Sequence, residues 1–541
     1  TVSMMVRTLP VHCLITSDIT VRQFMENVKS QLTEAMANDI YSFVEIAAST
    51  GLSPDVQFSY QAGYHSTPPI GGVEIRDEEL EFNATGDILN VQLLEEKGHL
   101  LLDIQFHSNR YSNQYIERFA GCYTDILREM MKRIDSGPQA KMAEIPLASR
   151  GEQARLLELG CGPEMKYDAS ESLVDILRRK AVEFADRPFI EYDGKIYSYK
   201  RFNEITDRIA GYLVSQGIAK EEAVGVMIGR SEMIPIYSLA IIKAGGSYMP
   251  LDPSFPEDRL KYMCEDAKVR IILTEGSLCR NAFPSFSGET IDWAQLAWAF
   301  DESACNDVSL PEVRPDDRMV ILYTSGSTGK PKGVELEQSG IINFSYWYVR
   351  EMGLDHQDVV AAYANYGFDA HMIDLYPSML AGACVHILPE DVRKDMVKLN
   401  DYLERNKITC AFLTTQIGHH IATMFDNGSL RTLVVGGEKV PVMESPSYRF
   451  VNGYGPTECS MFSTFYDVKG HFEGEFIGRA LANYELAVVD SRLNLLPEGA
   501  AGELLIMGHG VARGYLNRPD VNSEKFKKRV ESGEFRGFNR V

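Results

Sequence analysis

Short apolar segments alternate with segments of helical periodicity between residues 170 and 275, and this alternation constrains the fold more than any other feature. Strands that alternate with helices in this way are typical of parallel sheets covered by helical layers. At 541 residues the chain exceeds one ordinary domain of about 150 residues, so we expect several folded units. The predicted helices are 173–184, 201–216 and 233–244, and the predicted strands begin at 188 and cover 195–199, 223–228 and 269–274.

The first 147 residues are predicted to form a separate mixed α/β unit. Thr20 is a suitable N-cap for the first of its helices, and the turn sequence EEKG at 95–98 separates two apolar runs, as expected for a β-hairpin. Residues 148–168 are irregular in pattern, and we interpret them as a linker with some helix. The predicted elements of the unit are a helix over 21–37, strands over 88–94 and 99–106, and a helix over 115–134.

The stretch from Leu322 to Gly333, LYTSGSTGKPKG, has the composition of a phosphate-binding loop. Glycines allow close approach of the backbone to a ligand, and hydroxyl and lysine groups add donors for phosphate oxygens. The spacing differs from the P-loop pattern because Lys330 and Lys332 are followed by proline and glycine. On composition alone, a surface turn is an equal alternative.

The order of residues in this loop closely resembles that of the adenylate-forming enzymes, which include amino-acid adenylation domains, acyl-CoA ligases and luciferases. The resemblance extends over about 370 residues, from about residue 170 to the end. Its motifs occur in the family's order: YSYKRFNEI (197–205), IIKAGGSYMPLDPSFPEDRL (241–260), the loop itself, NGYGPTE (452–458) and GELLIMGHGVARGYLNRP (502–519). The resemblance implies a multi-layer α/β adenylate-forming core.

The sequence of the N-terminal region resembles that of the C-terminal lobe of a peptide-synthetase condensation domain, whose fold is like that of chloramphenicol acetyltransferase. The segments that carry this resemblance are TLPVHC and LNVQLLEEKGHLLLDIQFHSNRYSNQYIERFAGCYTDIL. We therefore expect the condensation lobe at 1–147, the linker at 148–168 and the large adenylation subdomain at 169–541. The small C-terminal subdomain, with its catalytic lysine, and the YxTGD and HHxxxDG motifs are not expected in the chain, and FRGF near Val541 is not accepted as the family's hinge motif. His419 and His420 are expected to be ordinary helix residues.

The family's nucleotide site can be carried over to this sequence residue by residue. A tyrosine ring can stack on adenine, a threonine hydroxyl can reach the α-phosphate, and a carboxylate can hold Mg²⁺. On spacing alone, YGP is as well explained by a turn and Glu458 by a solvated charge. The implied catalytic residues are Thr324, Lys332 and Glu458, with Glu458 as the Mg²⁺ ligand. The implied ATP-binding residues are Thr324, Ser325, Gly326, Ser327, Thr328, Gly329, Lys332, Gly437, Glu438, Asn452, Gly453, Tyr454, Gly455 and Thr457.

The segment GFDAHMIDLYPSMLAGA (367–383) distinguishes amino-acid adenylation domains from the acyl-CoA ligases of the family. In amino-acid adenylation domains the aspartate of an FDA-like motif pairs with the substrate α-ammonium, and here that residue is Asp369. The alternative is that Asp369 caps a helix beginning near His371, and it could do both. The implied substrate pocket consists of Asp369, Ala370, Ile373, Phe412, Val434, Gly436, Gly453, Met461 and Phe462. Its other members carry no charge and its glycines leave space, so we expect valine first, then leucine or isoleucine.

The resemblance implies a nonribosomal peptide synthetase fragment that uses ATP and Mg²⁺ to convert an amino acid to an aminoacyl adenylate and releases pyrophosphate. The product would pass to the phosphopantetheine of a peptidyl carrier domain outside the chain, and the remaining synthetase domains would be the other partners. Two alternatives stay open. One is a stand-alone acyl-CoA ligase, which Asp369 argues against, and the other is a fragment that binds substrates but turns over poorly.

Composition excludes several other classes of protein. A net charge of −22 argues against non-specific nucleic-acid binding, and no run of 18 apolar residues indicates a membrane span. The nine cysteines form no C-x-x-C pair, which argues against structural zinc and fits reduced thiols in a cytoplasmic protein.

Overall fold

The computed structural model contains two compact units, which we call unit 1 (Thr1–Leu156 with Val488–Glu503) and unit 2 (Leu157–Ala487 with Leu504–Val541). None of the described helices is both long and apolar enough to cross a membrane. The structure describes residues 9–16, 18–38, 40–41, 43–51, 56–61, 89–96, 98–137, 139–304, 309–325, 330–474 and 476–526. The C-terminal FRGF segment therefore lies outside the described residues.

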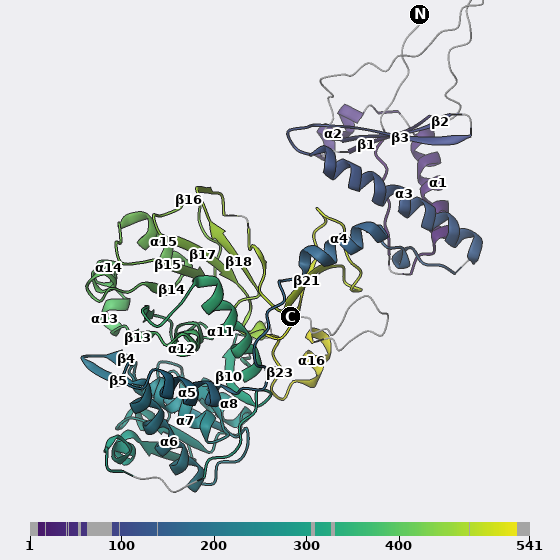
Figure 1. Ribbon diagram of the computed structural model, residues 1–541. Coiled ribbons are helices and arrows are strands. Elements are labelled where there is room, and N and C mark those ends of the chain that lie inside the picture. Colours follow the sequence, from purple (N-terminus) through teal and green to yellow (C-terminus); the bar gives the residue numbers. More distant parts are fainter. Residues whose placement is uncertain are drawn as a thin grey trace, which may run out of the picture. The chain divides into compact units, whose positions relative to one another are not determined.

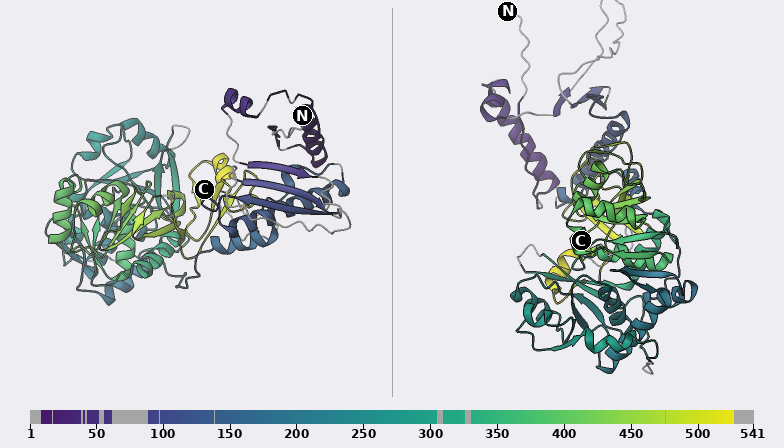
Figure 2. Two further views of the ribbon diagram at one scale, coloured as in Figure 1. Left: turned by 90° about the horizontal axis from the view of Figure 1, so that it is seen from above. Right: turned by 90° about the vertical axis from the view of Figure 1, so that its left-hand side faces the viewer.

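Unit 1 is a three-stranded sheet with helix α3 along one face (Figures 1 and 2). The predicted helix over 21–37 is confirmed, because Thr20 and Gln23 form a capping box at its start. The predicted hairpin and second helix are also confirmed, and the helix begins earlier than expected because Ser112 caps it. The elements are α1 (Val21–Ala37), α2 (Phe43–Thr50), β1 (Val56–Gln61), β2 (Leu89–Glu96), β3 (His99–Phe106), α3 (Asn113–Ser136) and α4 (Arg150–Gly160), which runs into unit 2.

Unit 2 is built on two large sheets, each mostly parallel (Figure 1). The first has the strand order β23-β11-β10-β7-β6-β8-β9. Its strands are β6 (Ala223–Met227), β7 (Ser247–Pro250), β8 (Ile271–Thr274), β9 (Glu289–Asp292), β10 (Arg318–Thr324), β11 (Lys332–Glu337) and β23 (Gly514–Tyr515). The second has the order β20-β18-β17-β15-β14-β12-β13-β4-β5. Its strands are β4 (Pro188–Tyr192), β5 (Lys195–Ser198), β12 (Val359–Ala362), β13 (Cys384–Ile387), β14 (Cys410–Thr414), β15 (Thr432–Gly436), β17 (Arg449–Tyr454), β18 (Thr464–Val468) and β20 (Arg479–Ala480).

Helices pack between the two sheets and against their outer faces. One core cluster joins residues of both sheets to a central group of helices, and two smaller clusters join the outer sheet faces to peripheral helices. The central α7 and α12 are buried almost throughout, and most of their positions are apolar. The central helices are α5 (Leu173–Glu183), α6 (Tyr199–Ser215), α7 (Met233–Lys243), α11 (Gln338–Met352) and α12 (His371–Ala381). The outer helices include α8 (Glu257–Asp266), α9 (Leu278–Ala282), α14 (Met396–Arg405) and α15 (Thr415–Met424).

This architecture confirms the alternation predicted between residues 170 and 275, and His419 and His420 lie on helix α15 as expected. It also explains where a site can form. Parallel strands β12, β14, β15 and β17 are neighbours in the second sheet, so the loops that follow them emerge at one edge. Ligands in open α/β folds bind outside the carboxyl ends of such strands. The predicted site residues Asp369 and Ala370, Gly436 to Glu438 and the NGYGPTE segment (452–458) all lie there.

Candidate functional site

The phosphate-loop sequence connects two antiparallel strands, β10 and β11. Thr324 lies opposite Lys332 in their register, so the two stems of the loop are adjacent. The hydroxyl of Tyr323 donates to Asp266 at 2.8 Å and fixes the end of β10. Ser325 is exposed, whereas the predicted contacts Gly326, Ser327, Thr328 and Gly329 lie outside the described residues. The described stems thus present a hydroxyl and an ammonium group side by side.

Tyr515 connects the phosphate-loop lysine to the predicted metal ligand. Its hydroxyl donates to the Glu458 carboxylate at 2.6 Å, and the ammonium nitrogen of Lys332 lies 5.1 Å from the centre of its ring. Burial and the Glu458 carboxylate raise the pKa of Tyr515. Strand β23 brings Tyr515 here by pairing with β11, with Val334 opposite Tyr515. A carboxylate is thereby held beside a cation, as a site for a metal-bound phosphate requires.

The segment NGYGPTE continues β17 into a single 3₁₀ turn, Thr457–Cys459. Tyr454 is 41% exposed, so its ring is accessible to a stacking partner, and the amide of Asn452 donates to the carbonyl of Phe476 at 3.3 Å. A Cβ on Gly455 would lie 2.3 Å from the carbonyl oxygen of Met461, so only glycine fits where the chain folds back. The predicted adenine-side residues are therefore gathered at the end of one strand.

Asp369 lies beside this segment and not at a helix cap. The Thr457 hydroxyl and the backbone N–H of Ala370 both act on the Asp369 carboxyl in the direction that lowers its pKa. Burial nevertheless raises the pKa of Asp369 from 3.8 to about 6, and the nearby Glu458 carboxylate acts in the same direction. The N-cap of α12 is Ala370, without a side-chain capping bond. The capping alternative for Asp369 is therefore wrong.

His371 anchors the loop that carries Asp369. Its Nδ1 atom lies 2.5 Å from the carbonyl oxygen of Phe368, and burial lowers the pKa of the imidazole to about 4. A neutral ring at pH 7 can donate its Nδ1 proton to that carbonyl. The loop is thus held without placing a second charge beside Asp369.

The predicted substrate pocket is part of the central core. Ile373, Phe412, Val434, Met461 and Phe462 are all buried members of its cluster, and Ala370 packs against it. They come from α12, from β14, from β15 and from the segment that follows the 3₁₀ turn. The structure therefore brings together the apolar positions that the resemblance implied.

The space expected beside the pocket glycines is filled by an aromatic ring, which corrects the sequence-based expectation. A Cβ on Gly453 would lie 2.4 Å from Cε2 of Phe462, and one on Gly436 would lie 3.0 Å from Cε1. Ser460 and Met461 precede this ring with φ values of +54° and +80°, which are unusual for residues with side chains. Glycine was required here for the close approach of Phe462 and not to leave an empty volume.

The wall formed by Gly437 and Glu438 follows β15 directly. Gly437 has a φ of +101°, which favours glycine, and the hydroxyl of Thr415 donates to the Glu438 carbonyl at 3.1 Å. Glu438 itself is exposed. Both residues therefore stand at the open edge of the sheet, next to the end of β17.

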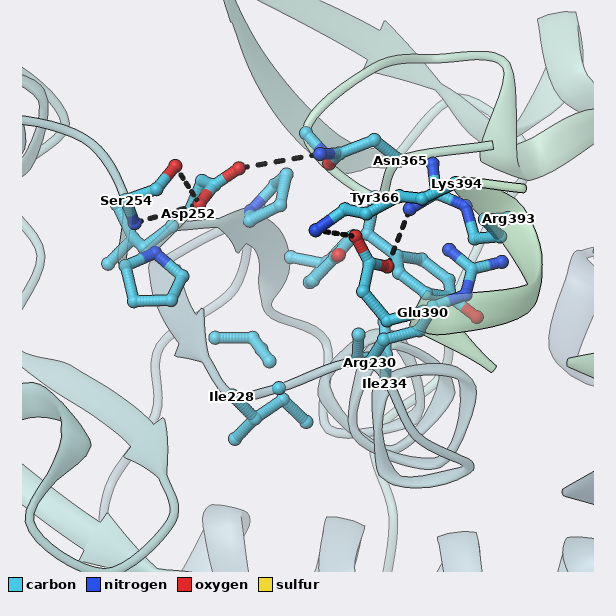
Figure 3. A pocket seen from close by; sticks show the side chains of 17 residues that line it. Ile228, Arg230, Ile234, Asp252, Ser254, Asn365, Tyr366, Glu390, Arg393 and Lys394 are labelled. Atoms are coloured by element: carbon cyan, nitrogen blue, oxygen red, sulfur yellow. Dashed lines mark hydrogen bonds and ion pairs between the residues drawn. The ribbon is translucent and has the colours of Figure 1, made fainter. Parts of the chain in front are cut away.

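A cavity of about 310 Å³ opens beside the loop that carries Asp369 (Figure 3). Asn365, Tyr366 and Gly367 form its side toward that loop. The guanidinium of Arg230 is fixed at its base by bonds to the carbonyls of Ala362, Ala364 and Leu388. The cavity therefore lies next to the predicted substrate loop.

Comparisons with known proteins identify the family. The family model for AMP-binding enzymes matches residues 177–516. The chain belongs to this family. Bacitracin synthase 1 of Bacillus licheniformis is 31% identical over 535 residues, which cover 96% of this chain and 10% of that protein. Surfactin synthase subunit 1 of Bacillus subtilis (strain 168) is 29% identical over 97% of this chain and 15% of that protein.

Solved structures of similar proteins support the same fold. A four-domain nonribosomal peptide synthetase bound to AMP and glycine aligns with a TM-score of 0.79 and 23% identity, over 97% of this chain and 41% of that one. The N-terminal subdomain of Klebsiella oxytoca NpsA, in complex with 3-hydroxybenzoyl-AMSN, aligns with a TM-score of 0.62 and 25% identity, over 70% of this chain and 96% of that one. The chain therefore has the fold of an adenylate-forming ligase, although it spans a tenth to about a seventh of the curated relatives named above.

Sequence reasoning missed three residues that shape the site. Tyr515 lies in a motif that had been interpreted as structural, Thr415 supports the 436–440 wall, and Phe344 packs against Phe462 at 5.7 Å between ring centres. The tyrosine stands at the end of a glycine-rich motif, but only the β11–β23 pairing brings it to Glu458.

Proposed function

We propose that the chain activates an amino acid as its aminoacyl adenylate for nonribosomal peptide synthesis. The observation that carries this proposal is that Asp369 lies close enough to Thr457 and Glu458 for both residues to act on its pKa. It joins the acid predicted to hold the substrate ammonium to the segment predicted to hold ATP. The substrate carboxylate would then lie near the α-phosphate.

In the proposed reaction a carboxylate oxygen of the amino acid attacks the α-phosphorus of ATP. A new oxygen–phosphorus bond forms, the bond from that phosphorus to the bridging oxygen of the β-phosphate breaks, and pyrophosphate leaves. Lys332 would counter the phosphate charge and Asp369 would orient the ammonium group. Once the ammonium group engages Asp369, the Thr457 hydroxyl would turn its single proton toward the α-phosphate. The Glu458 carboxylate, partly buried and fixed by Tyr515, fits Mg²⁺ as an oxygen donor. Bound Mg²⁺ would neutralise phosphate charge.

The proposed substrate is a branched aliphatic amino acid, valine before leucine or isoleucine. Phe462 lies across Gly436 and Gly453, and its ring contacts Phe412 with 6.0 Å between ring centres. This filling shortens the apolar pocket and supports the smallest of the three side chains. One methylene changes the free energy of binding by about 1–3 kcal/mol, so a preference for valine over leucine and isoleucine is measurable.

The proposal extends to unit 1 and to partners outside the chain. We assign residues 1–147 to the C-terminal lobe of a condensation domain on the sequence resemblance of residues 89–127, and the curated relatives named above align over 96% and 97% of the chain. A peptidyl carrier domain with phosphopantetheine would accept the aminoacyl group. The assignment predicts that the chain forms no peptide bond from aminoacyl carrier substrates, and peptide formation would contradict it.

The test is ATP–pyrophosphate exchange by the full chain with each of the twenty amino acids and with fatty acids, beside calorimetry with ATP and with valine. Exchange that is strongest with valine supports the proposal. Exchange with fatty acids alone would favour the rival acyl-CoA ligase. Binding of valine and ATP without exchange would favour a binding platform.

A further inference from the structure

Three metal-ligating side chains meet on the face of the second sheet, at residues that no part of the adenylation site uses. Cys384 and His386 are two residues apart on β13, so their side chains point to the same face. Glu191 lies opposite His386 in the parallel register of β4 and β13. One sulfur, one ring nitrogen and one carboxylate oxygen all lie within 4.8 Å of one another.

The geometry of the cluster is close to that of a tetrahedral ion site. Nε2 of His386 lies 3.1 Å from a carboxylate oxygen of Glu191. Zinc binds nitrogen and oxygen at about 2.0–2.2 Å and sulfur at about 2.3 Å, so tetrahedral ligand atoms are about 3.3–3.8 Å apart. The histidine and glutamate are already near that separation. The thiol has to move by about 1 Å, which a small side-chain rotation provides.

The histidine in this cluster is not satisfied by its ion pair. His386 is 7% exposed, and its Nδ1 atom has no hydrogen-bond partner among the residues that the structure describes. The ring nitrogen that faces Glu191, and would therefore bind the ion, is Nε2. Cys384 and Glu191 are partly exposed and leave a path for an ion. Tyr402 of α14 covers the histidine ring edge-on, with 6.4 Å between ring centres.

We propose that Glu191, Cys384 and His386 form a binding site for a divalent ion of the zinc class, with a water as fourth ligand. The donor set of one sulfur, one nitrogen and one oxygen selects Zn²⁺ or Co²⁺ over Mg²⁺, which prefers oxygen ligands alone. On binding, a sulfur–metal bond forms and the thiol proton passes to solvent. The ion would tie β4 to β13, and the site is distinct from the Mg²⁺ proposed at Glu458. Cysteine spacing could not indicate it, because the ligands come from two strands.

The test is Co²⁺ titration of the metal-free full chain, with equilibrium dialysis against Zn²⁺ as a second measurement. We expect a thiolate-to-cobalt charge-transfer band and one more bound Zn²⁺ per chain than in Cys384→Ser. His386→Gln and Glu191→Gln should weaken Zn²⁺ binding by at least about tenfold. Cys161→Ser, which removes an exposed thiol with neighbouring carboxylates, is the control and should keep the band.

A third measurement needs no variant. Zn²⁺ should protect Cys384 from alkylation in the wild-type chain, as read by mass spectrometry of its peptide, while the Cys161 peptide keeps its rate. The proposal is overturned if the band is absent, if it persists in Cys384→Ser, or if Zn²⁺ leaves alkylation of Cys384 unchanged. Any of these results would reduce the cluster to a histidine–glutamate ion pair.

Discussion

Replacing Asp369 by asparagine should stabilise the protein and weaken its affinity for amino acids at the same time. Burial raises the pKa of this carboxyl from 3.8 to about 6, so ionised Asp369 carries a cost of up to about 3 kcal/mol in the substrate-free fold. The folded state binds the proton more tightly than the unfolded state. The contribution of Asp369 to the free energy of unfolding therefore falls as the pH rises from about 4 to 6, and it does not recover above pH 6.

At pH 7 Asp369→Asn should consequently raise the free energy of unfolding by up to about 3 kcal/mol. Valine binding should weaken by about 10- to 150-fold, since a hydrogen bond to a charged group contributes about 1.5–3 kcal/mol. ATP affinity should be unchanged. Denaturant titration and calorimetry measure these effects, with Asp391→Asn at an exposed position as the control. A destabilised variant that still binds valine would refute the argument.

Proton release gives the same prediction an independent readout. At pH 6 about half of the Asp369 carboxyls are protonated, so an entering ammonium group should release up to about half a proton per valine bound. Calorimetry in two buffers of different ionisation enthalpy measures this number. Thr457→Val removes the hydroxyl that lowers the pKa of Asp369, so the pH at which valine binding begins should move upward. A pH profile that does not move would contradict the assigned contact.

Tyr515→Phe should weaken Mg²⁺-dependent ATP binding by up to about tenfold, because it removes the hydroxyl that fixes Glu458 and keeps the ring beneath Lys332. A Mg²⁺ titration of ATP affinity checks this, and an unchanged midpoint would show that the hydroxyl does not position the carboxylate. Gly453→Ala should destabilise the protein by about 1–3 kcal/mol and weaken valine binding, since its Cβ would displace the Phe462 ring. Thermal denaturation measures the loss, and adding Phe462→Leu should recover much of it; a neutral Gly453→Ala would contradict the packing.

Local sequence signals predicted most of the fold. The helix over 21–37 was predicted at its observed bounds because periodicity and the capping residue Thr20 agree. The hairpin followed from its turn and apolar runs. The elements of the 170–275 region were predicted from the alternation of strand-like and helix-like periodicity. This signal depends only on residues that are close together in the sequence. Such features need no knowledge of long-range packing.

The sequence could not predict the parts of the site that depend on contacts between distant segments. The sequence could not show that Tyr515 meets Glu458, because this depends on how β23 pairs with β11. It also could not show that Phe462 occupies the space beside Gly453, because two residues with positive φ redirect the chain just before the ring. In both cases the side chain is brought in by backbone geometry that no local pattern encodes.

The placement of the pocket in the central core has a consequence for how substrate choice can change. The predicted nucleotide residues Tyr454 and Glu438 are exposed at the sheet edge, so substitutions there cost little packing. Ile373, Val434 and Phe462 instead belong to the cluster that holds both sheets and the central helices together. Close-packed cores resist changes of even one methylene. A change of substrate side chain at this site therefore requires compensating changes in the same cluster, whereas the ATP-binding edge can stay the same.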